Sequence, residues 1–124
     1  MSEEKLTAII SDIDGTLALL NGRDPYNASL AHTDLLNNPV AEILWRFQVR
    51  LLFVSGRWEK DREVTEKWLR KNGFTNGFDL FMRPDGDYRQ DAIIKKEIYD
   101  REIKDKYKIL FVIDDRKQVK RMWV

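Results

Sequence analysis

Short apolar runs alternate with amphipathic stretches along this chain. Four runs have the length and composition of buried parallel strands, and they cover residues 6–10, 50–54, 78–82 and 109–113. The segments between them carry apolar residues at helical spacing, so strands and helices are expected to alternate. Right-handed crossovers then build a parallel sheet that is covered on both faces. The pattern predicts an α/β fold, a three-layer, Rossmann-like domain with a central parallel sheet.

The predicted helices cover residues 39–48, 61–72, 91–106 and 117–123. Pro39 suits the first turn of the first helix, and Gly73 closes the second. No repeat, low-complexity tract or long linker interrupts this series. We therefore expect residues 1–124 to form a single domain.

Composition narrows the class of protein. A hydrophobic fraction of 43% is that of a globular chain. The 22 Lys and Arg residues almost balance the 21 Asp and Glu residues, so binding to a polyanion needs a local basic patch. The absence of cysteine excludes disulfides, thiolate metal sites and cysteine nucleophiles.

The amino-terminal sequence is acidic and polar, unlike a signal peptide, and the apolar runs are too short to cross a bilayer. We expect a soluble cytoplasmic protein with no membrane association.

Polar segments follow three of the predicted strands. They are Asp12-Ile13-Asp14-Gly15-Thr16, Ser55-Gly56-Arg57 and Asp114-Asp115. In open α/β sheets, ligands bind at the carboxyl ends of the strands. The three segments therefore predict one site at this edge of the sheet.

The acidic residues of these segments indicate a metal site. Asp12 and Asp14 are two positions apart, so their side chains can converge as the chain leaves the sheet. An Asp-rich turn, or a helix cap at Asp114 and Asp115, is the plainer interpretation. Carboxylates crowded at one edge repel each other, however, and Mg²⁺ resolves that repulsion with oxygen ligands. We favour a magnesium site.

Two further residues are candidates on weaker grounds. Ser55 follows a strand, where its hydroxyl can hold a phosphoryl oxygen, although Ser-Gly-Arg is also an ordinary turn sequence. Lys95 lies four residues after Asp91, so it either forms an ion pair on a helix surface or reaches over the sheet edge to neutralise Asp12 and a bound phosphate. Helix geometry alone does not decide between these interpretations.

These elements, in this order, resemble the haloacid dehalogenase (HAD) superfamily. Its four motifs match Asp12 to Thr16, Ser55, Lys95 and Asp114-Asp115. Within it, the chain is most similar to the 3′-phosphatase domain of phage polynucleotide kinase. That narrower likeness rests on Gly22-Arg23-Asp24-Pro25-Tyr26, Val54-Ser55-Gly56-Arg57, Arg89-Gln90-Asp91 and Ile113-Asp114-Asp115-Arg116.

The resemblance implies the following roles. Asp12 attacks phosphorus and forms an aspartyl-phosphate, while Asp14 protonates the leaving oxygen and then activates water. Ser55 and Lys95 hold phosphoryl oxygens. Mg²⁺ would be bound by Asp12, the Asp14 carbonyl and Asp115, with Asp114 acting through water. Substrate would be bound by Thr16, Arg23, Arg57 and Asp91. Since Asp14 acts first as an acid, its pKa should be raised by its surroundings.

The resemblance also has consequences for substrate access. The segments in which many relatives carry a cap domain are short here, so we expect a minimal cap or none, and an open site suited to phosphorylated nucleic-acid ends. Ser11 and Ala92 depart from the family pattern. The chain ends soon after the last motif and has no G-x-x-x-x-G-K-[ST] loop, so we expect neither a further sheet strand nor a kinase half. No obligatory protein partner is evident. A phage origin would place the protein in the host cytoplasm.

Two other functions remain open at this stage. One is a HAD phosphatase for small phosphate esters or phosphoproteins. The other is a phosphorylatable signalling module like a response-regulator receiver, which also combines acids, a hydroxyl, a lysine and Mg²⁺. In a receiver the paired acids lie on the first strand and the acceptor on a later one, the reverse of the order here. Motif order therefore favours an enzyme.

Overall fold

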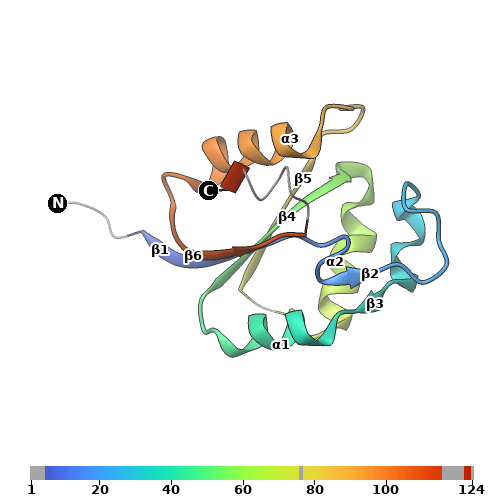
Figure 1. Ribbon diagram of the computed structural model, residues 1–124, viewed down its shortest axis with the longest axis horizontal. Helices are drawn as coiled ribbons and strands as arrows, with labels where there is room; N and C mark the ends of the chain where they lie inside the picture. The colour runs from blue at the N-terminus through green and yellow to red at the C-terminus, as the bar shows by residue number, and fades with distance from the viewer. Residues whose placement is uncertain (1–4, 76, 116–121, 124) are drawn as a thin grey trace.

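The computed structural model describes residues 5–75, 77–115 and 122–123 (Figure 1). Its strands are β1 (Leu6–Ser11), β2 (Ala18–Leu19), β3 (Leu35–Leu36), β4 (Arg50–Trp58), β5 (Phe78–Arg83) and β6 (Tyr107–Ile113). Its α-helices are α1 (Asn38–Arg46), α2 (Arg62–Lys71) and α3 (Asp91–Ile98). Shorter helical turns are η1 (Ala28–Thr33), η2 (Glu59–Asp61) and η3 (Tyr99–Ile103).

A four-stranded parallel sheet in the order β5-β4-β1-β6 forms the centre of the fold. The chain moves from β1 outward to β4 and β5, then crosses back to place β6 on the other side of β1. The strand order therefore reverses at β1, the place where open α/β sheets bind ligands. The predicted α/β fold is confirmed. In this fold the carboxyl ends of β1 and β6 lie side by side.

The two faces of the sheet bury separate cores, which explains the three layers. Alternate residues of each strand point to opposite faces. Ile9 and Phe53 pack with α1 and α2, whereas Ile10 and Leu52 pack with Ile94 of α3. Figure 1 shows α3 on one side of the sheet and α1 on the other.

The main differences from the sequence-based prediction concern β4, the third helix and the pair β2–β3. Strand β4 continues through Ser55 to Trp58 instead of ending at Val54, and its pairing with β5 shifts register over this stretch. The third helix ends as an α-helix at Ile98 and continues as the π-type turn η3. The short antiparallel pair β2–β3 was not predicted. The helix predicted over residues 117–123 falls largely outside the described residues.

Candidate active site

The segment after β1 turns tightly and carries the first two acids. The backbone N–H of Asp12 donates to the carbonyl of Ile113 at 2.9 Å, which ties the end of β1 to the end of β6. Gly15 has a φ of +78°, a left-handed conformation that glycine adopts without strain. Its N–H donates to the carbonyl of Ala18 at 2.9 Å. The turn holds Asp12 and Asp14 at the sheet edge.

Lys95 reaches the sheet edge rather than the solvent. Its side chain is 1% exposed, and Nζ donates to Asp12 Oδ1 at 2.8 Å and to Asp114 Oδ2 at 2.9 Å. Burial lowers the pKa of Lys95, but the charges of both carboxylates outweigh it and leave the pKa raised. Of the two interpretations of Lys95, the geometry therefore supports the one in which its side chain reaches the sheet edge. Among the described residues, Asp91 forms its ion pair with Arg83 and not with Lys95. A charged ammonium group lies between the two buried acids.

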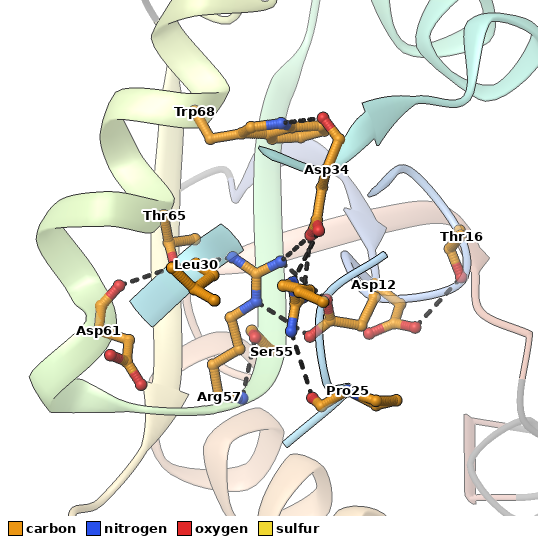
Figure 2. Close-up of polar contacts among 12 residues, drawn as sticks. Asp12, Thr16, Pro25, Leu30, Asp34, Ser55, Arg57, Asp61, Thr65 and Trp68 are labelled. Atoms are coloured by element: carbon orange, nitrogen blue, oxygen red, sulfur yellow. Dashed lines mark hydrogen bonds and ion pairs between the residues drawn. The ribbon is translucent and has the colours of Figure 1, made fainter. Parts of the chain in front are cut away.

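Asp12, Asp114 and Asp115 form the carboxylate cluster of the site. One oxygen from each lies within 4.8 Å of the others, and Asp12 and Asp114 are buried. Thr16 Oγ1 donates to Asp12 Oδ2 at 3.1 Å (Figure 2). The same oxygen lies 3.4 Å from Asp115 Oδ1. Three carboxylate oxygens at this spacing, with a hydroxyl among them, fit the all-oxygen donor set that Mg²⁺ prefers.

Burial governs the ionisation of Asp12. Desolvation, assisted by the charge of Asp114, raises the pKa of Asp12 to about 7 even though Lys95 acts in the opposite direction. A divalent cation beside a carboxylate favours its charged form. A divalent cation bound by this cluster would therefore favour the ionised form of Asp12.

Two buried arginines hold the carboxylate of Asp14. Arg57 donates to it from Nη2 at 2.7 Å and from Nε at 3.0 Å, and Arg23 donates from Nη2 at 3.2 Å. Both guanidinium groups also bind Asp34, whose carboxylate lies 2.7 Å from Arg23 Nε and 3.1 Å from Arg57 Nη2. Figure 2 shows Arg57 between Asp34 and Thr65 of α2, which accepts from Nη1 at 2.9 Å. The arginines predicted to bind substrate thus have carboxylate partners in this structure.

The pKa of Asp14 is lowered, whereas the sequence-based expectation was a raised pKa. Burial does raise the pKa of Asp14, but the hydrogen bonds and charges of Arg57 and the charge of Arg23 outweigh it, and the net shift is downward. The sequence-based prediction was wrong because it placed no cation on this carboxylate. The Asp14 side chain remains 41% exposed, so it faces the opening of the site.

Asp34 is the component of this arrangement that sequence reasoning missed. Its side chain is buried, and its backbone carbonyl accepts the indole N–H of Trp68 at 2.9 Å. No motif marks it, since it follows η1 rather than a predicted strand. Only the pairing of two arginines around one acid reveals it.

The irregular end of β4 places Ser55 and Gly56 at the site. Ser55 is buried, and its hydroxyl accepts the N–H of Arg57 at 3.0 Å. The register shift between Val54 and Trp58 re-aims this stretch, as bulges beside active sites do. A methyl group on Gly56 would lie 2.6 Å from Asp91 Oδ1, so glycine is needed for that carboxylate to approach the strand.

Asp91 organises the second wall of the site. Its carboxylate pairs with the buried Arg83, whose Nε donates to the carbonyl of Gly56 at 2.9 Å. A cleft of about 820 Å³ opens between this wall and the segment after β1. Asp12, Asp14, Arg57, Asp91 and Asp115 all line it.

Half of the ten predicted site residues therefore line the cleft, while their roles remain predictions. Lys95, Ser55, Thr16 and Asp114 lie directly behind the lining residues through the contacts above. Within the part of the chain that the structure describes, no helix has the length and apolar character needed to span a membrane.

Comparison with known proteins gives consistent matches. Residues 6–124 match the family model described as the polynucleotide kinase PNKP phosphatase domain. A protein of Autographa californica nuclear polyhedrosis virus, named for polynucleotide kinase and RNA ligase activities, is 31% identical over 129 residues, which is 94% of this chain and 17% of the viral protein.

Two solved structures are similar over nearly the whole chain. A chain of a Pnkp1/Rnl/Hen1 complex has a TM-score of 0.88 and 48% identity, and the match covers 98% of this chain and 43% of that one. A chain of a Pnkp1/Rnl/Hen1 RNA repair complex has a TM-score of 0.88 and 46% identity, with 99% and 42% covered. The chain thus spans less than half the length of each of these relatives.

Proposed function

The chain belongs to the family of polynucleotide kinase PNKP phosphatase domains, and we propose that it removes 3′-phosphates from polynucleotide ends with Asp12 as covalent nucleophile. One observation carries the proposal. The buried carboxylate of Asp12 is held by Lys95 and Thr16 beside Asp114 and Asp115, at the inner end of a cleft whose mouth presents Asp14.

Asp12 and Asp14 divide the chemistry into two displacements. A carboxylate oxygen of Asp12 attacks phosphorus, the bond from phosphorus to the ribose 3′-oxygen breaks, and Asp14 gives that oxygen a proton. Asp14 then takes a proton from water, whose oxygen attacks the phosphorus of the aspartyl-phosphate. Inorganic phosphate leaves and Asp12 regains its carboxylate. Lys95 and Ser55 hold phosphoryl oxygens during both steps.

The lowered pKa of Asp14 sets a condition on the first displacement. Asp14 is ionised in the free protein, yet the leaving oxygen needs its proton. A phosphate dianion entering the cleft adds negative charge beside Asp14, and a neighbouring like charge raises the pKa of a carboxyl group. Arg23 and Arg57 keep the carboxyl in place while its proton is gained and lost.

The carboxylate cluster is proposed to hold Mg²⁺. Asp12 and Asp115 would bind it directly, with the backbone carbonyl of Asp14, and Asp114 would act through water. When bound, Mg²⁺ offsets the negative charge that opposes attack of a carboxylate on a phosphate ester.

The polynucleotide substrate is inferred from the family and from the open cleft. The relatives are named for polynucleotide kinase, RNA ligase and RNA repair, so repair of broken strands is the context that we propose for this domain. Phosphatases for small esters share the same acids, and they remain the second candidate until substrates are compared.

A substrate panel with matched variants tests the proposal. Initial rates with Mg²⁺ are measured on 3′-phosphorylated oligonucleotides, 5′-phosphorylated oligonucleotides, 3′-mononucleotides and p-nitrophenyl phosphate. We expect the highest kcat/KM on the 3′-phosphorylated oligonucleotides and loss of essentially all turnover in Asp12→Asn and Asp14→Asn. Asp105→Asn, which changes an exposed acid away from the cleft, is the control. A higher kcat/KM on mononucleotides would favour the small-ester function, and wild-type turnover in Asp12→Asn would exclude the covalent mechanism.

A further inference from the structure

The two most exposed aromatic side chains of the described residues line the same cleft. Tyr26 is 98% exposed and Tyr88 is 83% exposed, and both border the space above Asp12 and Asp14. Leaving an aromatic ring in water forgoes the stabilisation that its burial gives, so it is notable when such rings gather at one opening.

Each tyrosine sits on a loop that a buried arginine fixes. Arg23 Nη1 lies 3.2 Å from the carbonyl of Asp24 and 3.3 Å from that of Pro25, and the N–H of Tyr26 donates to Asp24 Oδ1 at 2.9 Å. In Figure 2, Pro25 is drawn below Asp12, and a dashed line ends at its carbonyl oxygen. Arg23 also binds Asp14, so the position of this loop is coupled to the position of the proposed acid.

The loop after β5 is held in the same way. Arg83 Nη1 donates to the carbonyl of Asp87 at 3.0 Å and also contacts the carbonyl of Arg89, which encloses Tyr88 between two fixed peptide groups. The Tyr88 ring packs edge-on against Trp58, with ring centroids 5.0 Å apart and planes at 79°. Loops that are already held in place by hydrogen bonds lose little conformational entropy when a flat ligand binds between them.

One positively charged side chain that lines the cleft is available to bind a second phosphate of the substrate strand, next to the phosphate that reacts. Among the cleft-lining cations, Arg57, Arg83 and Arg89 each pair with carboxylates. Lys60 Nζ lies 5.2 Å from the centroid of the Trp58 ring and forms no ion pair within the described residues. Among the described residues that line the cleft, Lys60 is therefore the cation that can bind a phosphate without first losing a carboxylate partner.

We propose that Tyr26 and the Tyr88–Trp58 pair form a base-binding subsite for a single-stranded 3′ end, with Lys60 contacting the next phosphate of that strand. The inference rests on the proposed function and names the substrate groups that the site recognises. Aromatic faces accept any base, because every base has a π-face. A cleft of about 820 Å³ has the size of a small-molecule site, which is enough space for the terminal nucleotide of one strand.

Steady-state kinetics of paired variants tests the subsite. For a single-stranded 3′-phosphorylated oligonucleotide, we expect KM to rise about 5- to 150-fold in Tyr26→Ala/Tyr88→Ala, the range for loss of one stacked base, while kcat stays near wild type. Tyr26→Phe/Tyr88→Phe keeps both rings and should restore KM. Ile43→Ala, an exposed apolar truncation on α1, serves as the surface control.

Two further arms separate base stacking from a general defect. An oligonucleotide whose last residue is abasic should raise KM in the wild type and add little in the Tyr26→Ala/Tyr88→Ala variant. Hydrolysis of β-glycerophosphate, which has no ring, should be equal in both proteins. Lys60→Gln should reduce the slope of log(kcat/KM) against log salt by about 0.7, the value for one single-strand phosphate contact.

The outcomes distinguish this inference from the proposed function. If the wild type hydrolyses the oligonucleotide and the alanine variant keeps the same KM, the subsite is overturned and the function stands. An equal loss on β-glycerophosphate also overturns it, because the tyrosines then support the site and not the base. If the wild type hydrolyses β-glycerophosphate but no 3′-phosphorylated oligonucleotide, the proposed function itself fails and the subsite with it.

Discussion

At the scale of single residues, the site depends on one buried acid that no sequence motif marks. Asp34 accepts hydrogen bonds from both Arg23 and Arg57, and those arginines in turn hold Asp14. The convergence of Asp12, Asp14, Lys95 and the Asp114-Asp115 pair could be predicted from the sequence, because these residues follow strand ends or match family motifs. Asp34 could not, since its partners are 11 and 23 residues away.

Asp34→Asn is expected to lower kcat about 100-fold or more, because neutral Asn holds two guanidinium groups less firmly and small displacements of catalytic groups are costly. Turnover of a 3′-phosphorylated oligonucleotide measures this, alongside thermal unfolding to check that the variant is folded. Asp100→Asn, which removes an exposed ion pair to Lys96, should keep wild-type kcat. Near-normal kcat in a folded Asp34→Asn protein would contradict the positioning role.

Gly15 and Gly22 form a matched pair for testing the carboxylate cluster. Both have positive φ, +78° and +86°, so alanine strains either one. A Cβ at Gly15 would lie 2.5 Å from Asp115 Oδ2, whereas a Cβ at Gly22 meets nothing within 4 Å. We expect Gly15→Ala to weaken Mg²⁺ binding about tenfold or more, and Gly22→Ala to lose only stability. Mg²⁺ titration of activity measures both, and equal Mg²⁺ affinity in the two variants would refute the contact with Asp115.

At the scale of elements, apolar runs were sufficient to find the four main strands and three helices. Their ends were harder to predict, because tertiary contacts set them. β4 extends past Val54 because Trp58 pairs again with Arg83 of β5 after the register shift. The pair β2–β3 has two residues in each strand, too short for any period to show. The turn η3 continues α3 because Ile98 and Ile103 are buried against the same face.

Polar contacts at the other end of the sheet predict a pH-dependent part of the stability. The Asp79 carboxylate accepts Arg50 Nη2 at 2.7 Å and Tyr107 Oη at 2.8 Å. The hydrogen bonds from Arg50 are the main cause of the lowered pKa of Asp79. A carboxyl whose folded pKa is depressed contributes stability above its unfolded pKa, about 3.9, and loses that contribution as pH falls through the folded pKa.

We therefore expect Asp79→Asn to lower the free energy of unfolding by about 1 kcal/mol at neutral pH, and the gap from wild type to shrink below about pH 4. Urea denaturation of both proteins across this pH range measures the gap. Asp105→Asn is the control and should track the wild type. A gap that stays constant down to about pH 2 would show that the loss is not electrostatic.

At the scale of the whole molecule, the sheet places β1, the first strand, beside β6, the last strand that the structure describes. Asp12 follows β1, and Asp114 and Asp115 follow β6, so the carboxylate cluster proposed to bind Mg²⁺ forms only when the sheet is complete. A ligand that binds the folded state alone stabilises it by mass action, by about 2.7 kcal/mol at 100 times its Kd. Mg²⁺ should therefore raise the unfolding temperature of the wild type, and chelation should reverse the rise.

Asp115→Asn should remove most of this thermal shift, while Asp79→Asn should keep it. Differential scanning fluorimetry with and without Mg²⁺ measures the shift, with Ca²⁺ as a second oxygen-seeking cation. A full Mg²⁺ shift in Asp115→Asn would place the ion elsewhere in the molecule.

The central claim is that Asp12 itself accepts the phosphoryl group, and it can be tested by trapping. Wild-type protein is mixed with a 3′-phosphorylated oligonucleotide and Mg²⁺, quenched in acid within one turnover, and digested for mass spectrometry. We predict that the peptide containing Asp12 gains the mass of one phosphoryl group, that hydroxylamine removes it, and that Asp12→Asn shows none. Product release in the same sample with no phosphorylated Asp12 peptide would contradict the account.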